Sequence, residues 1–294
     1  MKTLLILVAV LAATATVTEP RRTSASVCEG GDDKGGHERS ETDWGYGDHN
    51  GPDTWPDTHP TCGGSKQSPV ALDTRQALLN TSWAPFEFTG YNYLPPYMEV
   101  TNTGHAVQVS ATIHASVSGG NLHGKYIFSQ FHYHFGAEND RGSEHTVNGN
   151  RFPAEVHLVH YLERYGSFSE ALKHDNGVAV LSVMLELSSE DNPFLKPIVE
   201  ALTEITNPGE SASITPFPIS YVLPSNTDSF FRYEGSLTTP ECNEVVVWTV
   251  FRETTPISEA QLEEFRKLKG AHGEPLADNY RPTQELNGRQ VYMS

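Results

Sequence analysis

The stretch best suited to chemistry is Gln130-Phe131-His132-Tyr133-His134-Phe135, whose pattern is typical of a β-strand. Residues two apart on a strand point to the same face of a sheet, so His132 and His134 should project together. A third histidine, His157, lies in an apolar stretch at 154–160 that also predicts a strand. A hairpin-like return would place His157 beside the first two. Three neutral imidazoles around Zn²⁺ leave the fourth tetrahedral position open, which is typical of a catalytic metal site.

The same alternation assigns hydrogen-bond partners to the histidines. Glu155 has the parity of His157, so its carboxylate can accept the free N–H of that ring. Gln130 stands in the same relation to His132 and can accept with its amide oxygen. Partners of this kind fix the imidazole tautomer and raise the basicity of the ligand nitrogen. We therefore expect Gln130 and Glu155 to support the metal ligands from behind.

Other interpretations of the histidines are open from the residues alone. The chain has 13 histidines, so a His-x-His pair could be an ordinary surface or core pair. The sequence has no His-Glu-x-x-His motif, which excludes a zincin protease, and its three widely spaced cysteines exclude a zinc finger. A cupin is the alternative from another class, because Glu138 follows the His-x-His pair. The glycines flanking that pair and the context of His157 do not fit the cupin motif.

The elements that must position these residues are mostly strands, separated by Gly, Pro and Asn breaks. Strands are expected at 105–111, 126–131, 155–161, 178–187 and 244–251. Short helices are expected at 167–174, at 194–205 and after the capping box Ser258–Gln261, ending by Gly270. Val159 shares the face of His157 and should line an apolar wall, whereas His160 points to the opposite face and is excluded as a ligand. No linker divides the body, so we expect one domain of about 250 residues built on a large sheet.

Composition narrows the range of partners. The chain has 294 residues, a formal charge of −17 and a mean hydropathy of −0.43, with a single long apolar run at its N-terminus. A polytopic membrane protein is therefore excluded. So acidic a chain should be repelled by nucleic acid and by anionic membranes. The expected partner is a small or neutral substrate, or a cation.

The N-terminal run predicts export. Residues 1–15 combine a basic start, an apolar core and the small-residue site Ala13-Thr14-Ala15, as in a secretory signal peptide. Residues 16–42 are expected to be a mobile leader, and no stop-transfer helix or lipid-anchor tail is expected. In an oxidising compartment two of the three cysteines (Cys28, Cys62 and Cys242) should be bridged, although their spacing does not say which two. Asn80-Thr81-Ser82 is a candidate N-glycosylation sequon.

Several ordered blocks together resemble the α-class carbonic anhydrases, and specifically the secreted type. They extend from Trp44 to Val291 and are Trp44-Gly45-Tyr46, 51–55, Gln67-Ser68-Pro69, 130–136, Gly142-Ser143-Glu144-His145, 154–160, 236–240 and 280–282. The resemblance implies a catalytic domain over 43–294 that hydrates CO₂ to bicarbonate and a proton. It also implies a single domain, mainly β, with a large, twisted, mostly antiparallel ten-stranded sheet and short peripheral helices.

The resemblance also implies a role for individual residues. His132, His134 and His157 would be the zinc ligands. Thr238 would accept a hydrogen bond from zinc-bound hydroxide while Glu144 takes the Thr238 proton, and His105 would be the proton shuttle. An exposed histidine titrates near neutrality, the range that a shuttle needs. The substrate pocket would comprise Val159, Val180, Leu237, Thr238, Thr239, Val246 and Trp248.

The remaining implications concern the cysteines and the departures from the family pattern. Cys62 and Cys242 would form the disulfide, which leaves Cys28 as an odd thiol available for a link to another chain. The departures are Thr103, Gln108, Phe135 and Glu241. Since none is a zinc ligand or a member of the Thr–Glu pair, we expect them to alter inhibitor affinity and water ordering and not to abolish activity. Two other functions are considered: that of a catalytically silent relative that only binds, and that of an acidic mineralisation protein that binds Ca²⁺.

Overall fold

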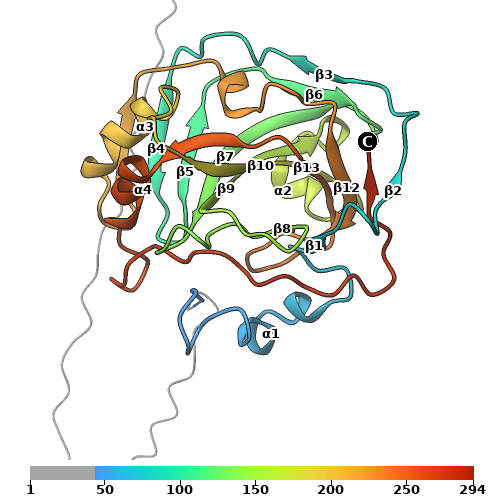
Figure 1. Cartoon of the computed structure of the whole chain (residues 1–294), viewed down its shortest axis with the longest axis horizontal. Coiled ribbons are helices and arrows are strands. Elements are labelled where there is room, and N and C mark those ends of the chain that lie inside the picture. The colour runs from blue at the N-terminus through green and yellow to red at the C-terminus, as the bar shows by residue number, and fades with distance from the viewer. Residues whose placement is uncertain (1–43) are drawn as a thin grey trace, which may run out of the picture. The chain divides into compact units, whose positions relative to one another are not determined.

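The two histidine-bearing stretches form neighbouring antiparallel strands, β7 (Tyr126–Phe135) and β9 (Ala154–Leu162), in which His132 pairs directly with His157. They lie in a computed structural model that describes residues 44–294 (Figure 1). The expected signal peptide at 1–15, the leader at 16–42, residue 43 and Cys28 lie outside the described residues. The described chain belongs to one compact unit, as expected for a single domain.

The main sheet has 13 strands in the described part of the chain. Ten of them follow one path, in the order β11-β4-β5-β7-β9-β10-β13-β12-β15-β2. Their bounds are β2 (Leu78–Leu79), β4 (Met98–Asn102), β5 (Val107–Ala111), β10 (Val178–Ser188), β11 (Ser211–Ile214), β12 (Phe230–Gly235), β13 (Val246–Phe251) and β15 (Tyr292–Met293). The others are β3 (Phe86–Thr89), β6 (Ser116–Gly119) and β14 (Thr255–Ser258), while β1 (Ala71–Leu72) and β8 (Thr146–Val147) form a separate pair.

The sheet is mixed but mostly antiparallel, as expected, since nine of the twelve strand pairs in the described part of this sheet are antiparallel. The expected number of ten strands matches the main path alone, because three further strands pair off it. Its parallel pairs are β10 with β13, β10 with β14, and β15 with β2. A parallel pair needs a crossover of a dozen or more residues, and residues 189–245 supply one between β10 and β13. The pattern of apolar residues predicts the strands that correspond to β10 and β13 but carries no information about their relative direction.

Helices are few, short and peripheral, as expected (Figure 1). They are α1 (Trp55–Thr58), α2 (Phe168–Ala171), α3 (Lys196–Ala201) and α4 (Glu259–Arg266), with 3₁₀ turns η1 (Pro60–Gly63), η2 (Glu163–Tyr165), η3 (Leu202–Glu204) and η4 (Ile219–Val222). The expected capping box opens α4 through Ser258 and Gln261. The helix expected at 194–205 begins only at Lys196. The Asn192 side chain accepts a hydrogen bond from Phe194 N and so caps the turn before the helix, not the helix itself. Among residues 44–294, no helix is long and apolar enough to cross a bilayer.

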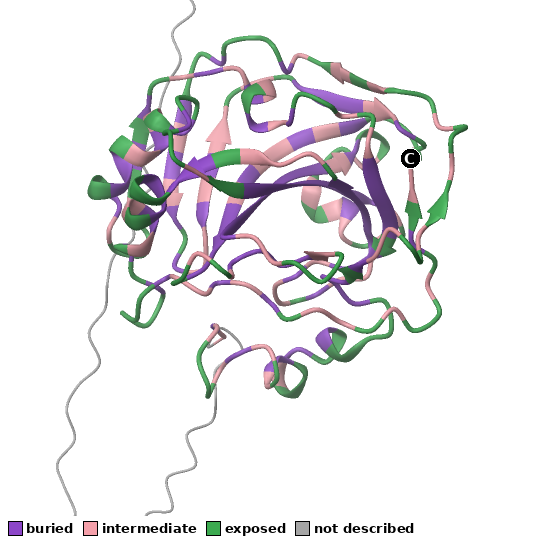
Figure 2. Cartoon of the chain, in the orientation of Figure 1, coloured by how far each residue is buried: buried purple, intermediate pink, exposed green. Residues whose placement is uncertain are grey.

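The central strands β7, β9, β10 and β13 are buried along most of their length (Figure 2). Alternate residues feed two apolar clusters on opposite faces of the sheet. One cluster contains Phe131, Leu158 and Leu181, and the other contains Val159 and Trp248. The three histidines have the parity of the second cluster. The sheet therefore presents them on a rigid, buried surface next to apolar side chains.

Candidate metal centre and active site

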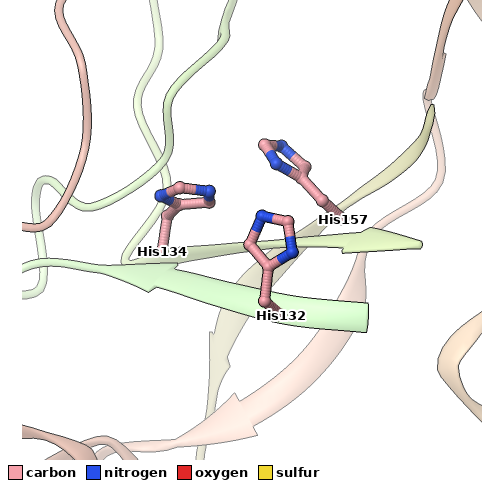
Figure 3. Close-up of side chains that lie close together, drawn as sticks. All are labelled: His132, His134 and His157. Atoms are coloured by element: carbon pink, nitrogen blue, oxygen red, sulfur yellow. The ribbon is translucent and has the colours of Figure 1, made fainter. Parts of the chain in front are cut away.

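The three predicted histidines converge. His132 and His134 stand on the same face of β7, and His157 faces them from β9 (Figure 3). One nitrogen from each ring lies within 4.8 Å of the other two. His134 and His157 are buried and His132 is partly exposed, which leaves one side of the group toward the outside. This spacing suits three ligands that share one ion.

Hydrogen bonds to the other ring nitrogens determine which nitrogens are free. His132 Nδ1 donates to Gln130 Oε1 at 3.0 Å, and His157 Nε2 donates to Glu155 Oε1 at 2.7 Å, both as the strand parity predicts. The nitrogens left for an ion are therefore His132 Nε2 and His157 Nδ1. Each imidazole is held in one tautomer and one orientation by its partner.

His134 has a partner that the sequence does not reveal. Its Nδ1 donates to the backbone carbonyl of Asn279 at 2.7 Å, while the Asn279 side chain accepts from Phe135 N at 2.8 Å. The opposite nitrogen, His134 Nε2, is buried and has no hydrogen-bond partner within residues 44–294. A buried polar atom without a partner is costly, so this nitrogen points to a missing partner such as an ion.

Glu155 anchors the polar network behind the histidines. Its Oε1 accepts from His157 Nε2, His145 Nδ1 at 2.7 Å and Ser182 Oγ at 2.6 Å. Its Oε2 accepts from the backbone N–H groups of Glu144 and His145, both at 2.8 Å. Although desolvation favours the neutral acid, the two imidazoles and these donors hold the pKa of Glu155 well below its ordinary value. A fully buried carboxylate is thus kept ionised beside the candidate ligands.

The electrostatics of the three imidazoles favour metal binding. Burial lowers the pKa of His132, His134 and His157, and the neighbouring imidazoles lower that of His132 further. The rings are therefore neutral at pH 7, which is the form that coordinates a metal. Neutral imidazoles, fixed tautomers and an unpartnered inward nitrogen together fit a divalent ion of the zinc type.

Glu144 is buried in a loop next to the histidines. Its Oε1 accepts from Arg281 N at 2.9 Å, and its Oε2 lies 3.4 Å from His134 Nε2. Burial raises the pKa of Glu144 to about 7, and the nearby Thr238 hydroxyl opposes that rise. Thr238 is itself buried. Thr238 and Glu144, which were predicted to form a pair, thus lie together beside the three histidines, although their loops are far apart in sequence.

An apolar wall adjoins the group. Trp248 lies against His157 with ring centroids 4.8 Å apart, and its Nε1 donates to Ser236 O at 3.0 Å. The predicted pocket residues Val159, Val180, Val246 and Trp248 are buried in one cluster, with Leu237 packed against it and Thr239 partly exposed beside Thr238. CO₂ is apolar, so a wall of this kind suits it.

His105 is placed differently from the exposed histidine expected. It is half-buried, with its ring stacked on Trp44 at a centroid distance of 3.7 Å and its Nε2 donating to Trp44 O at 3.0 Å. This burial lowers the pKa of His105, opposed by the bond to the carbonyl. Trp44 therefore holds the candidate shuttle in one position. Thr103 fixes the same turn by accepting from the backbone N–H groups of His105 and Ala106.

The remaining predictions and omissions concern loops. Cys62 and Cys242 form a disulfide, as predicted. Five residues of the network have no role that the sequence predicts, namely His145, Ser182, Tyr233, Asn279 and Arg281. His145 Nε2, for example, lies 2.7 Å from Tyr233 Oη. The available signals were the family blocks that contain His145, next to Glu144, and Arg281. Glu138, the cupin-type ligand, is exposed and outside the three-histidine group.

A mainly β fold, three imidazoles that face one another and a buried Thr–Glu pair are typical of a metal-dependent hydratase. A family model for eukaryotic-type carbonic anhydrase matches residues 50–294. The chain is 38% identical over 263 residues to Carbonic anhydrase 1 of Mus musculus, covering 87% of this chain and 99% of that protein. It is also 38% identical over 260 residues to Carbonic anhydrase 3 of Sus scrofa, with 86% and 98% covered. The chain belongs to the eukaryotic-type carbonic anhydrase family and is an enzyme, and its family supports the hydration of CO₂.

Proposed function

We propose that this enzyme hydrates CO₂ reversibly to bicarbonate and a proton with one Zn²⁺ held by His132, His134 and His157. The observation that carries the proposal is the approach of three tautomer-fixed imidazole nitrogens to within 4.8 Å. Zinc held by three histidines, for which carbonic anhydrases are the general example, activates water as a nucleophile at neutral pH. The chain's own residues supply the orientation, the apolar surface and the proton path.

Thr238 and Glu144 orient the nucleophile in this proposal. The Thr238 hydroxyl donates its proton to the Glu144 carboxylate, so its oxygen lone pairs remain to accept a hydrogen bond from a water between the imidazoles. Arg281 N and Glu155, through the backbone N–H of Glu144, keep that carboxylate in place. CO₂ would lie against Val159, Val180, Leu237, Val246 and Trp248, and Thr239 would contact the departing bicarbonate.

His105 would carry the proton away. Each turnover releases one proton, and buffer must receive it through a group that titrates near the working pH. The half-buried imidazole of His105 has one nitrogen engaged by Trp44 O, which leaves Nδ1 as the proton acceptor. A His105→Ala enzyme should be slowed in dilute buffer and rescued by added imidazole. Equal rates in dilute buffer would exclude this role.

Stopped-flow measurement of CO₂ hydration, with metal content determined on the same sample, tests the reaction. Wild-type protein should contain about one zinc per chain, and activity should follow zinc content. His157→Ala should lose both, whereas His160→Gln, altered at the excluded histidine, should keep both. An active, metal-free protein, or an inactive protein with full zinc, would contradict the proposal.

We further propose that the protein is secreted, with a signal peptide at 1–15. The disulfide between Cys62 and Cys242 supports an oxidising destination. Asn80 is partly exposed and is the proposed glycan acceptor, while Cys28 is proposed to be free or linked to another chain. Expression of the full chain in a eukaryotic host tests this directly. The expected product is found in the medium, begins after residue 15 and loses mass on treatment with a glycosidase.

A further inference from the structure

The sheet face opposite the metal centre carries a buried arginine with no acidic partner. Arg232 lies on β12, is only 6% exposed, and pairs across the sheet with Thr249 of β13. Its Nε and Nη2 donate to Thr249 Oγ1 at 3.3 and 2.9 Å. Within residues 44–294 no carboxylate lies within ion-pairing distance of it, and Nη1 has no hydrogen-bond partner. The neighbouring residue Tyr233 points the other way, toward His145.

Such an arginine is unusual because buried charges are normally paired. Aromatic rings surround the guanidinium, with Cζ 5.6 Å from the Trp83 ring and 5.3 Å from the Phe230 ring. Cation–π contacts of this kind recover part of the desolvation cost but supply neither a hydrogen-bond acceptor nor a counter-charge for the guanidinium. Burial accordingly lowers the pKa of Arg232 to about 10. The group remains charged at pH 7 and lacks a counter-ion.

Arg232 also lines a cavity of about 500 Å³. The strands next to it, β12, β15 and β2, are neighbours at one edge of the sheet (Figure 1). This volume is within the range of small-molecule sites. Trp83 and Tyr292 supply aromatic walls, and the side-chain amides of Asn80 and Asn121 add polar groups. The cavity thus combines one uncompensated cation with apolar surface.

The other charged groups of the cavity do not neutralise Arg232. Arg289 donates from Nε, Nη1 and Nη2 to backbone carbonyls, those of Leu286, Glu234, Gln67 and Glu285. Glu234 lines the cavity but is exposed and forms no ion pair in the described chain. The electrostatic balance of the lining therefore favours an anion.

We propose that this cavity binds a small organic carboxylate, with the carboxylate on the Arg232 guanidinium and the apolar body against the aromatic surface that Trp83 and Tyr292 form together. A carboxylate matches the fork of N–H donors and supplies the missing counter-charge. The apolar body would cover aromatic surface that an inorganic anion leaves wet. This site is distinct from the proposed CO₂ site, because Arg232 and Trp248 project from opposite faces of the sheet.

Sodium benzoate is a suitable probe, and the indole N–H signals of the four tryptophans locate where it binds. Titration of ¹⁵N-labelled, zinc-loaded protein should shift the Trp83 signal saturably, with a Kd of about 1–10 mM for a ligand of this size. The Trp248 signal, beside His157, reports the metal centre in the same spectrum and should not move. The protein should be produced without N-glycosylation, because Asn80 lines the cavity. A shift of Trp248 alone, or of neither signal, overturns the proposal.

Two variants and two ligands sharpen the test. Arg232→Gln should weaken benzoate binding by roughly tenfold or more, the effect of losing a charged hydrogen bond. Glu234→Gln changes an exposed residue and should fold normally. It removes a negative charge from the cavity, so it should bind benzoate more tightly than wild type. Unchanged or weaker binding would overturn the proposal even if Arg232→Gln fails to fold. Benzamide, which is neutral, should not shift Trp83. Inorganic phosphate should bind more weakly than benzoate, and equal binding would overturn the assignment to an organic carboxylate.

Discussion

Replacing Glu155 by glutamine isolates the control of the imidazole tautomer. The side chain keeps its shape but loses its charge and one acceptor. The amide oxygen should stay on the side of Oε2, where it can accept from the backbone N–H groups of Glu144 and His145. The opposite orientation would leave both of these buried donors unpaired, at a cost of about 1–3 kcal/mol each. Backbone donors cannot change role, whereas imidazoles and hydroxyls can.

The amide NH₂ then faces His157 Nε2, which in wild type donates to Glu155 Oε1 at 2.7 Å. Two donors cannot share this contact, so the His157 proton should move to Nδ1, the nitrogen that faces the metal position. The expected consequence is a zinc affinity roughly 10–100-fold lower, equivalent to about 1.4–2.7 kcal/mol. At saturating zinc the stabilisation by metal should fall by the same amount, which corresponds to roughly 3–11 °C in Tm.

Competition with a fluorescent chelator measures the zinc affinity, and calorimetry with and without zinc measures the shift in Tm. Gln130→Ala is the matched control, because it removes the partner of a ring that is partly exposed and whose Nδ1 can be hydrated instead. Its loss of affinity should be smaller than that of Glu155→Gln. A folded Glu155→Gln protein with unchanged zinc affinity would refute the tautomer argument.

Three further outcomes are expected. Burial lowers the pKa of His160 from 6.5 to about 4, so between these pH values the unfolded chain binds more protons than the folded one. About 3 kcal/mol of the free energy of unfolding should therefore be lost as the pH falls from 6.5 to 4. Urea unfolding across this range should show a free energy of unfolding that depends less on pH in His160→Gln than in wild type. Thr238→Ala should lower kcat/KM for CO₂ hydration by roughly 10²-fold while zinc content is unchanged, and Thr238→Ser should restore most of it; a loss of zinc instead would show a structural role. Replacing Cys62 and Cys242 together by alanine should lower the free energy of unfolding by roughly 2–5 kcal/mol, measured by denaturant titration under oxidising conditions, and an unchanged midpoint would count against the bridge as a stabilising link.

The part of the site that lies on strands could be predicted from the sequence. Period-two alternation alone places His132, His134 and His157 on one face and gives Gln130 and Glu155 their partners, because strand geometry fixes the direction of each side chain. It also places His160 on the opposite face, where its ring lies against Tyr91. These predictions needed only the pairing of β7 with β9, which follows from their proximity in the chain.

The part that lies on loops could not be predicted from periodicity. Asn279 reaches His134 across 145 residues through a backbone carbonyl, and a carbonyl is available at every residue, so no residue type marks it. Arg281 positions Glu144 through a backbone N–H, which is equally silent in the sequence. The family blocks identify these loops as important but do not say which atoms act.

This division has a physical basis in what each group must do. Metal ligands must hold their positions within a few tenths of an ångström, and buried strands with satisfied hydrogen bonds provide this rigidity. Thr238 and His105, proposed to orient the nucleophile and to carry the proton, lie outside the strands. Trp44 and Thr103 hold His105, so substitutions there should change proton transfer without altering zinc binding. Of the four departures from the family pattern, Thr103 and Glu241 fall outside the strands and Gln108 and Phe135 lie on β5 and β7, whereas the three candidate ligands and Glu155 are all in place on β7 and β9.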